Sequence, residues 1–167
     1  MRESLKTGTK APSFTLPSVH SGEEQLVSLS DYKGQYVVLF FYPKDNTPHC
    51  TAEVCAFRDH LKLFEDLDSY QVAVLGVSVD SLDTHRAFVE KNQLNYPLLS
   101  DAEQHVSKAY GVWGMLKFMG KEFPGVIRST FLIDPEGYIA HVFNEVRNTR
   151  GHAEEVLQRL QELVSQS

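Results

Sequence analysis

The sequence predicts an α/β fold in which a mixed central sheet is covered by helices on both faces. Residues 36–42 and 72–79 are apolar runs with almost no alternation, which is typical of strands buried on both faces. Between such runs lie segments whose apolar residues recur at spacings of three or four, as in amphipathic helices. Two later strands, at 129–134 and 138–143, flank a Pro-Glu-Gly sequence at 135–137 that predicts a hairpin turn.

The remaining elements follow in order along the chain. Two short strands at 11–17 and 26–29, joined by a Ser/Gly/Glu turn, precede a single helical turn at 30–34 that ends at a glycine. A long helix runs from Pro48 to about residue 67. Beyond it we expect a helix from Ser81 to about Asn92, a short extended segment at 97–100, a small helix at 103–110 and a final helix from about Gly151 to Val164. This order fits a thioredoxin-like fold.

Apolar stripes show which faces of two helices point inward. They comprise Val54, Phe57, Leu61, Phe64 and Leu67 on the first long helix, and Val156, Leu157, Leu160 and Leu163 on the last. A second group of large apolar residues could rim a docking surface, although a packed loop is the simpler interpretation. That group comprises Tyr110, Trp113, Met115, Phe118 and Met119.

Composition restricts the class of protein and of partner. The 167 residues predict one domain, residues 1–167, with 42% hydrophobic and 23% charged residues as in ordinary globular proteins. A net charge of −6 argues against nucleic acid or an anionic membrane as the main partner. The first ten residues contain no apolar segment. We therefore expect a cytoplasmic protein without a membrane anchor, and a plastid location after removal of a transit peptide stays open.

Both cysteines lie in one stretch, between Pro43 and the first long helix. Two cysteines do not make a disulfide framework, so they indicate redox or catalytic use. Thr47 is a good N-cap and Pro48 suits the first helical position, which places Cys50 third in the helix. There a thiolate meets free backbone N–H groups and the positive end of the helix dipole.

The helix start alone does not activate a thiol strongly. Cys50 follows Thr47 by the spacing of a capping box, so an ionised sulfur could stand where the box has a carboxylate. The dipole is worth only about 0.3–1 kcal/mol, at most ~2 kcal/mol. A strongly activated Cys50 therefore needs a cation from elsewhere in the chain.

Cys55 should face away from Cys50. Residues five apart on an α-helix are rotated by about 140° and have Cα atoms about 8.7 Å apart. This rotation places Cys55 on the polar side of the helix, with Asp59, Lys62 and Asp66. A disulfide needs Cα atoms about 4.4–6.8 Å apart, so a Cys50–Cys55 bond requires the helix to unwind locally.

Several motifs together resemble the peroxiredoxins. The pattern Pro43-x-x-x-Thr47-x-x-Cys50 resembles their active-site motif, and Cys55 five residues on resembles the Q type, or bacterioferritin comigratory protein, subfamily. His49 departs from the glycine that is usual in the subfamily. Further matches cover nearly the whole chain: Ala11-Pro12-x-Phe14, Asp80-Ser81 with His85 and Phe88, residues 97–101, and residues 126–134, which are similar to the strand that carries the family's arginine.

The resemblance implies a thiol-specific peroxidase that reduces hydrogen peroxide and organic hydroperoxides. Cys50 would be the peroxidatic cysteine and Cys55 the resolving one. Arg128 would supply the cation, Thr47 would hydrogen-bond the peroxide oxygen or the sulfur, and Pro43 would shield the thiolate from water. The Cys50 sulfenic acid would condense with Cys55, and thioredoxin or a similar dithiol would reduce the disulfide.

Other interpretations of these residues stay open. Cys50 could be an inert core residue, Arg128 a surface ion-pair residue, Thr47 only a cap and Pro43 only the end of a strand. The rival functions are a thiol–disulfide oxidoreductase, disfavoured by the lack of a Cys-x-x-Cys motif, and a redox sensor or binding module. None of the seven histidines pairs with a cysteine at zinc spacing, so we expect no metal site. We also expect no cofactor, and a monomer or weak dimer.

Overall fold

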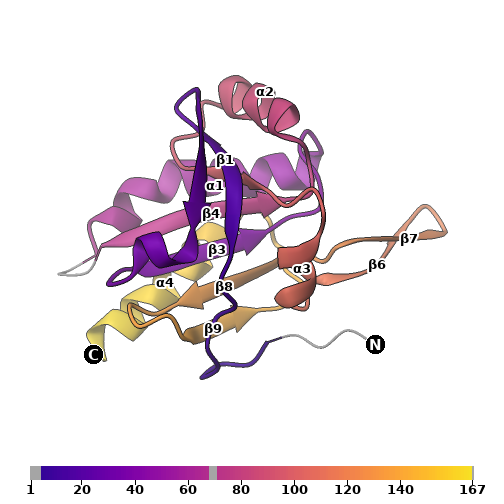
Figure 1. Ribbon diagram of the computed structural model, residues 1–167. Coiled ribbons are helices and arrows are strands. Elements are labelled where there is room, and N and C mark those ends of the chain that lie inside the picture. Colours follow the sequence, from indigo (N-terminus) through magenta and orange to yellow (C-terminus); the bar gives the residue numbers. More distant parts are fainter. Residues whose placement is uncertain (1–4, 68–70, 167) are drawn as a thin grey trace.

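In the part of the chain that the structure describes, a seven-stranded mixed sheet forms the centre, as the sequence predicts (Figure 1). The computed structural model describes residues 5–67 and 71–166. The strands, in spatial order, are β2 (Glu23–Ser28), β1 (Thr15–His20), β5 (Leu98–Ser100), β4 (Val72–Ser78), β3 (Tyr36–Phe41), β8 (Ser129–Ile133) and β9 (Ile139–Phe143). Strands β3, β4 and β5 are parallel, and the other pairs in this sheet are antiparallel.

Helices cover both faces of the sheet, which confirms the predicted layers. They are α1 (Pro48–Glu65), α2 (Leu82–Asn92), α3 (His105–Ala109), α4 (His152–Ser165) and the 3₁₀ turn η1 (Leu29–Tyr32). One hydrophobic cluster joins α1, α2 and α4 to the first face. A second cluster joins α3, the start of the chain and η1 to the other face. No helix within residues 5–67 and 71–166 has the length and apolarity needed to cross a membrane.

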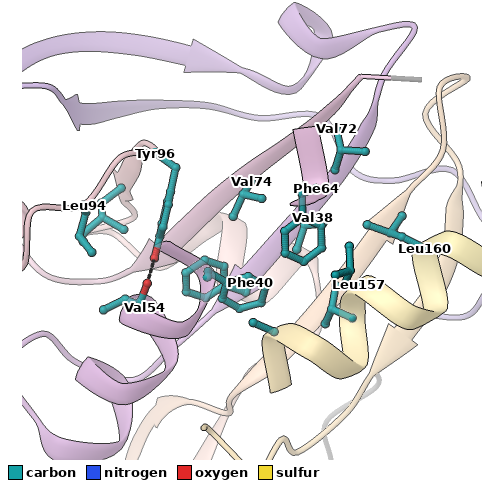
Figure 2. Close-up of a cluster of buried hydrophobic side chains, with 14 of the residues drawn as sticks. Val38, Phe40, Val54, Phe64, Val72, Val74, Leu94, Tyr96, Leu157 and Leu160 are labelled. Atoms are coloured by element: carbon teal, nitrogen blue, oxygen red, sulfur yellow. Dashed lines mark hydrogen bonds between the residues drawn. The ribbon is translucent and has the colours of Figure 1, made fainter. Parts of the chain in front are cut away.

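Strand β3 is buried on both sides, which explains its unbroken apolar sequence. Val38 and Phe40 belong to the first cluster, and their neighbours along the strand belong to the second. Figure 2 shows the first cluster, in which Leu157 and Leu160 of α4 lie close to the side chains of the sheet. Phe40 stacks on Phe57 of α1 with ring centroids 4.4 Å apart, so the helix is held firmly above the strand.

The bounds of the first two strands differ from the prediction of 11–17 and 26–29. The turn between β1 and β2 contains only Ser21 and Gly22, both with positive φ (52° and 78°), as a tight two-residue hairpin requires. Glu23 and Glu24 therefore belong to β2, where they are exposed on an edge strand. Charged side chains at an edge discourage pairing with another chain, and they also hide the apolar alternation of a strand.

The sequence did not predict the hairpin of β6 (Trp113–Phe118) and β7 (Lys121–Val126). It projects from the body beside α3 (Figure 1) and turns at Met119 and Gly120, both with positive φ. The expected packed loop is wrong here, because Met115, Phe118 and Met119 are 58%, 67% and 86% exposed. Tyr110, by contrast, is buried as expected. The other helices and strands begin and end within two residues of their predicted bounds.

Candidate active site

Strand β3 and helix α1 place Cys50 at the edge of the core. The chain leaves β3 after Phe41, bends, and enters α1 at Pro48 with Thr47 as the N-cap residue, as predicted. Cys50 is the third residue of the helix and is 1% exposed. Its sulfur thus lies in the first helical turn, where backbone N–H groups are not used by the helix.

Strand pairing brings Arg128 to this sulfur. β8 runs antiparallel to β3, with Phe41 opposite Ser129, so the start of β8 lies beside the end of β3. Arg128 immediately precedes β8, and its Nη2 donates to Cys50 Sγ at 3.3 Å. The structure therefore brings together the two residues that the sequence motif paired across 78 positions.

A buried carboxylate completes the contact. Arg128 Nη1 donates to Glu53 Oε1 at 2.8 Å, and Glu53 is fully buried. Burial raises the pKa of Glu53 to about 7, against the lowering effect of Arg128. Burial lowers the pKa of Arg128, but the negative charges of Glu53 and Cys50 outweigh it and raise that pKa overall. The Arg128 guanidinium thus stays positively charged between the Cys50 sulfur and the Glu53 carboxyl group.

The sequence motifs did not single out Glu53 as a residue of the site. Glu53 Oε2 is buried without a hydrogen-bond partner among the described residues. Glu53 follows Cys50 by three positions, so the two side chains share a face of α1. That spacing was the available signal, because an acidic residue on the face of a buried cysteine needs a cation there.

The bend before α1 contains the other residues that the sequence predicted for the site. Thr47 occupies the predicted N-cap position, but its hydroxyl donates to the Lys44 carbonyl at 3.0 Å and makes no side-chain hydrogen bond to α1. The bend passes through Asn46, whose φ is +64°, and this brings the Lys44 carbonyl back towards Thr47. Pro43 and Thr47 are half-buried, whereas the unusual His49 is exposed to solvent.

Cys55 occupies a different environment on the same helix. Its Sγ donates to Asn92 Oδ1, at the end of α2, at 3.7 Å. Burial raises the pKa of Cys55, and the side chain is half-buried against the first cluster. Cys55 lies on the polar side of α1, as predicted, with exposed Asp59 and Lys62, but the end of α2 contacts its sulfur. Both cysteines are free thiols on one continuous helix, as the helical geometry requires.

A buried polar network fixes the bend to β4 and α2, and the sequence alone did not reveal it. Asp45 accepts from the Tyr42 hydroxyl at 2.6 Å, and its other carboxylate oxygen lies 2.6 Å from His85 Nδ1. Asp80 accepts from the Asp45 backbone at 2.9 Å and from the Ser78 hydroxyl at 2.6 Å. Ligand atoms of Asp45, Asp80 and His85 lie within 4.8 Å of one another, a spacing at which a cation could be held, but hydrogen bonds already engage them.

Known proteins match this chain along most of its length. The AhpC/TSA family model matches residues 7–142. Peroxiredoxin Bcp of Bacillus subtilis (strain 168) is 44% identical over 159 residues, covering 95% of this chain and 97% of the relative. Peroxiredoxin Bcp of Escherichia coli (strain K12) is 44% identical over 158 residues, covering 95% and 97%.

Solved structures agree in fold. The bacterioferritin comigratory protein of Xanthomonas campestris, studied for its alkyl peroxide reduction activity, superposes with a TM-score of 0.82 at 34% identity and covers 95% of this chain and 98% of that one. Peroxidoxin BcpB from Mycobacterium tuberculosis gives a TM-score of 0.79 at 35% identity, with coverages of 95% and 97%. The thioredoxin-like fold and these relatives show that the chain belongs to the AhpC/TSA family, as a peroxiredoxin of the Q, or bacterioferritin comigratory protein, type and hence a thiol peroxidase.

Proposed function

We propose that the protein reduces hydrogen peroxide and organic hydroperoxides with Cys50 as the attacking sulfur. The observation that carries this proposal is the 3.3 Å contact between Cys50 Sγ and Arg128 Nη2 in the first turn of α1. A guanidinium and a helix N-terminus both favour the thiolate, which is the nucleophilic form. Arg128 is thus the cation that strong activation of Cys50 requires in addition to the weak helix dipole.

In the first step the Cys50 thiolate attacks one peroxide oxygen and the O–O bond breaks. The leaving hydroxide or alkoxide takes up a proton, and Cys50 becomes a sulfenic acid. Negative charge moves onto the leaving oxygen, so donors placed there lower the barrier. Arg128 is the proposed donor to that oxygen. The Thr47 hydroxyl, which donates to the Lys44 carbonyl in the resting site, would accept a hydrogen bond from the peroxide O–H. Pro43 limits access of water, and Glu53 holds one arm of the guanidinium so that the other faces the sulfur.

In the second step the Cys55 thiol condenses with the sulfenic acid. A Cys50–Cys55 disulfide forms and water leaves, and thioredoxin or a similar dithiol then reduces the disulfide by thiol exchange. The first turns of α1 must unwind for this step, because the folded helix keeps the two Cα atoms about 8.7 Å apart. The cycle needs a reducing compartment, which is the reason for the predicted cytoplasmic location. The monomer or weak dimer also remains a prediction.

Peroxide consumption coupled to thioredoxin and its reductase tests this proposal. Cys50→Ser should abolish consumption, because the attacking sulfur is lost. Cys55→Ser should consume one equivalent and then stall, or turn over only with a small thiol that can reach the sulfenic acid. Equal single-turnover rates for the wild type and Cys50→Ser would contradict the assignment. Disulfide exchange without peroxide turnover would instead favour an oxidoreductase or a sensor.

A further inference from the structure

One residue at the end of α2, Asn92, contacts both Cys55 and the neighbouring cation Arg58. Asn92, the last residue of α2, accepts from the Cys55 thiol with its side-chain oxygen at 3.7 Å. Its backbone carbonyl accepts from Arg58 Nη1 at 2.7 Å. Arg58 follows Cys55 by three positions on α1, so both side chains lie on the face that meets α2.

The orientation of the Asn92 amide determines which form of Cys55 it favours. Asn92 Nδ2 donates to the Phe88 carbonyl at 3.0 Å, which fixes the nitrogen there and leaves the oxygen for the sulfur. An oxygen acceptor stabilises the S–H form of Cys55 and opposes the thiolate. The resting site therefore holds Cys55 as a thiol.

Arg58 acts in the opposite direction. Burial raises the pKa of Cys55, the guanidinium of Arg58 lowers it, and the carboxylate of Asp59 raises it. Tyr96 also interacts electrostatically with Cys55 and Arg58, and its hydroxyl donates to the Val54 carbonyl at 2.6 Å (Figure 2). Among the described groups that act on the Cys55 thiol, Arg58 is thus the one that favours its ionisation.

Several contacts keep Arg58 in place while the start of α1 moves. The carbonyl that it binds is at the C-terminal end of α2, where the helix dipole favours a cation. Asn95 Nδ2 donates to the backbone carbonyl of Arg58 at 3.3 Å. This part of α1 is therefore tethered to the segment after α2, whereas the turn that carries Cys50 is at the helix end.

We propose that Arg58 is a positioning residue of the second half-reaction, holding Cys55 against the end of α2 and promoting the thiolate that attacks the oxidised Cys50. This inference rests on the proposed Cys50–Cys55 disulfide. The Cys55 sulfur attacks the Cys50 sulfur, the S–S bond forms and the S–O bond breaks. The departing hydroxide combines with the proton released by Cys55 to give water. Cys55 is oxidised as the sulfenic sulfur is reduced.

The first test measures Cys55 without relying on turnover. In a Cys50→Ser background Cys55 is the one remaining thiol, so its alkylation rate against pH reports its ionisation. Adding Arg58→Gln should move the midpoint up by about half to one pH unit, since a partly exposed cation is lost. Arg58→Lys should recover most of the shift. Arg86→Gln removes an exposed α2 cation that binds Asp83 at 2.8 Å, and should leave the midpoint unchanged.

The second test follows a single turnover with Cys50 intact. Below the midpoint, Arg58→Gln should form the disulfide about three- to ten-fold more slowly, while its sulfenic acid forms at the wild-type rate. Unchanged pH profiles in Arg58→Gln, with a disulfide in the oxidised wild type, would overturn the role of Arg58 alone. Equally slowed sulfenic acid formation would also overturn it, because the effect would then act on Cys50. If peptide mapping finds no Cys50–Cys55 disulfide in the oxidised wild type, the proposed cycle fails together with this inference.

Discussion

Two cysteines on one helix, five positions apart, lie in opposite chemical environments. Cys50 is 1% exposed and receives a hydrogen bond from the Arg128 guanidinium. Cys55 is half-buried, and its thiol donates a hydrogen bond to the amide oxygen of Asn92. One sulfur meets a donor that favours the thiolate, whereas the other meets an acceptor that favours the thiol.

This difference shows how a protein can give two chemically identical groups separate tasks. In the proposed cycle, the sulfur that reacts first is held ready by a fixed cation, and the sulfur that reacts second is kept protonated until the first has been oxidised. Early ionisation of Cys55 would serve no purpose, because its partner cannot be reached while α1 is intact. Helix rotation provides the separation, since positions five apart face different neighbours.

The largest expected effect comes from removing the cation at Cys50. Arg128→Met should slow single-turnover peroxide reduction by about 10²–10³-fold, as losing one well-placed donor to a developing charge typically does. Cys55 alkylation should hardly change, because Arg128 belongs to the other environment. Stopped-flow mixing with one equivalent of peroxide measures the rate.

A double variant controls for the buried carboxyl group that Arg128→Met would leave unpaired. Arg128→Met with Glu53→Gln removes both charges, so a folded double variant with the same loss of rate assigns the effect to the guanidinium. A rate within about two-fold of the wild type in either variant would return the activation to the helix start and Thr47.

The second prediction concerns the charge at Glu53. The pKa of Glu53 is about 7 in the folded protein, against an ordinary value of 4.5. Between these values the folded state retains a proton that the unfolded state has lost, so stability falls as the pH rises. Relative to Glu53→Gln, the wild type should lose about 3 kcal/mol of unfolding free energy between about pH 4 and about pH 8. Urea denaturation across this range measures the difference.

Glu65→Gln is the matched control, because Glu65 is an exposed glutamate on the same helix. Its stability profile should run parallel to that of the wild type. If Glu53→Gln also runs parallel to the wild type, burial does not hold the proton on Glu53, and the Cys50 environment is less shielded from water than its geometry indicates.

The smallest expected effect is confined to the beginning of α1. On oxidation, amide hydrogen exchange should accelerate by about ten-fold or more at residues 50–57, because the disulfide cannot form within the helix. Residues 61–65 should change much less, since Phe64 remains buried in the first cluster. Mass spectrometry of the reduced and oxidised protein compares the two segments. Unchanged protection at 50–57 would mean that no Cys50–Cys55 bond had formed.

Local sequence patterns predicted most of the fold. The unbroken apolar run identified β3, and the Thr-Pro start placed Cys50 third in α1. These features depend on chain neighbours a few residues apart, which is the range over which propensity and periodicity act. The hairpin of β6 and β7 was not predicted, because its large apolar residues do not alternate with polar residues along the strand and several of them face solvent.

Contacts between residues far apart in the sequence could be identified only from the tertiary structure. The family motif paired Arg128 with Cys50, but the contact itself depends on β8 lying beside β3 in one register. The ion pair of Glu53 needs that same register, so the helix sequence could signal the need for a cation but not identify Arg128 as the partner.

By itself, the sequence determined the elements, the inward stripe of α1 and the opposed directions of its two cysteines, because helix geometry fixes them locally. Only the tertiary structure decided that the end of α2 contacts Cys55 and that its thiol meets an amide oxygen there. The physical reason is that burial, and the choice of hydrogen-bond partner, depend on which distant segment packs against a face, and no local spacing encodes that segment.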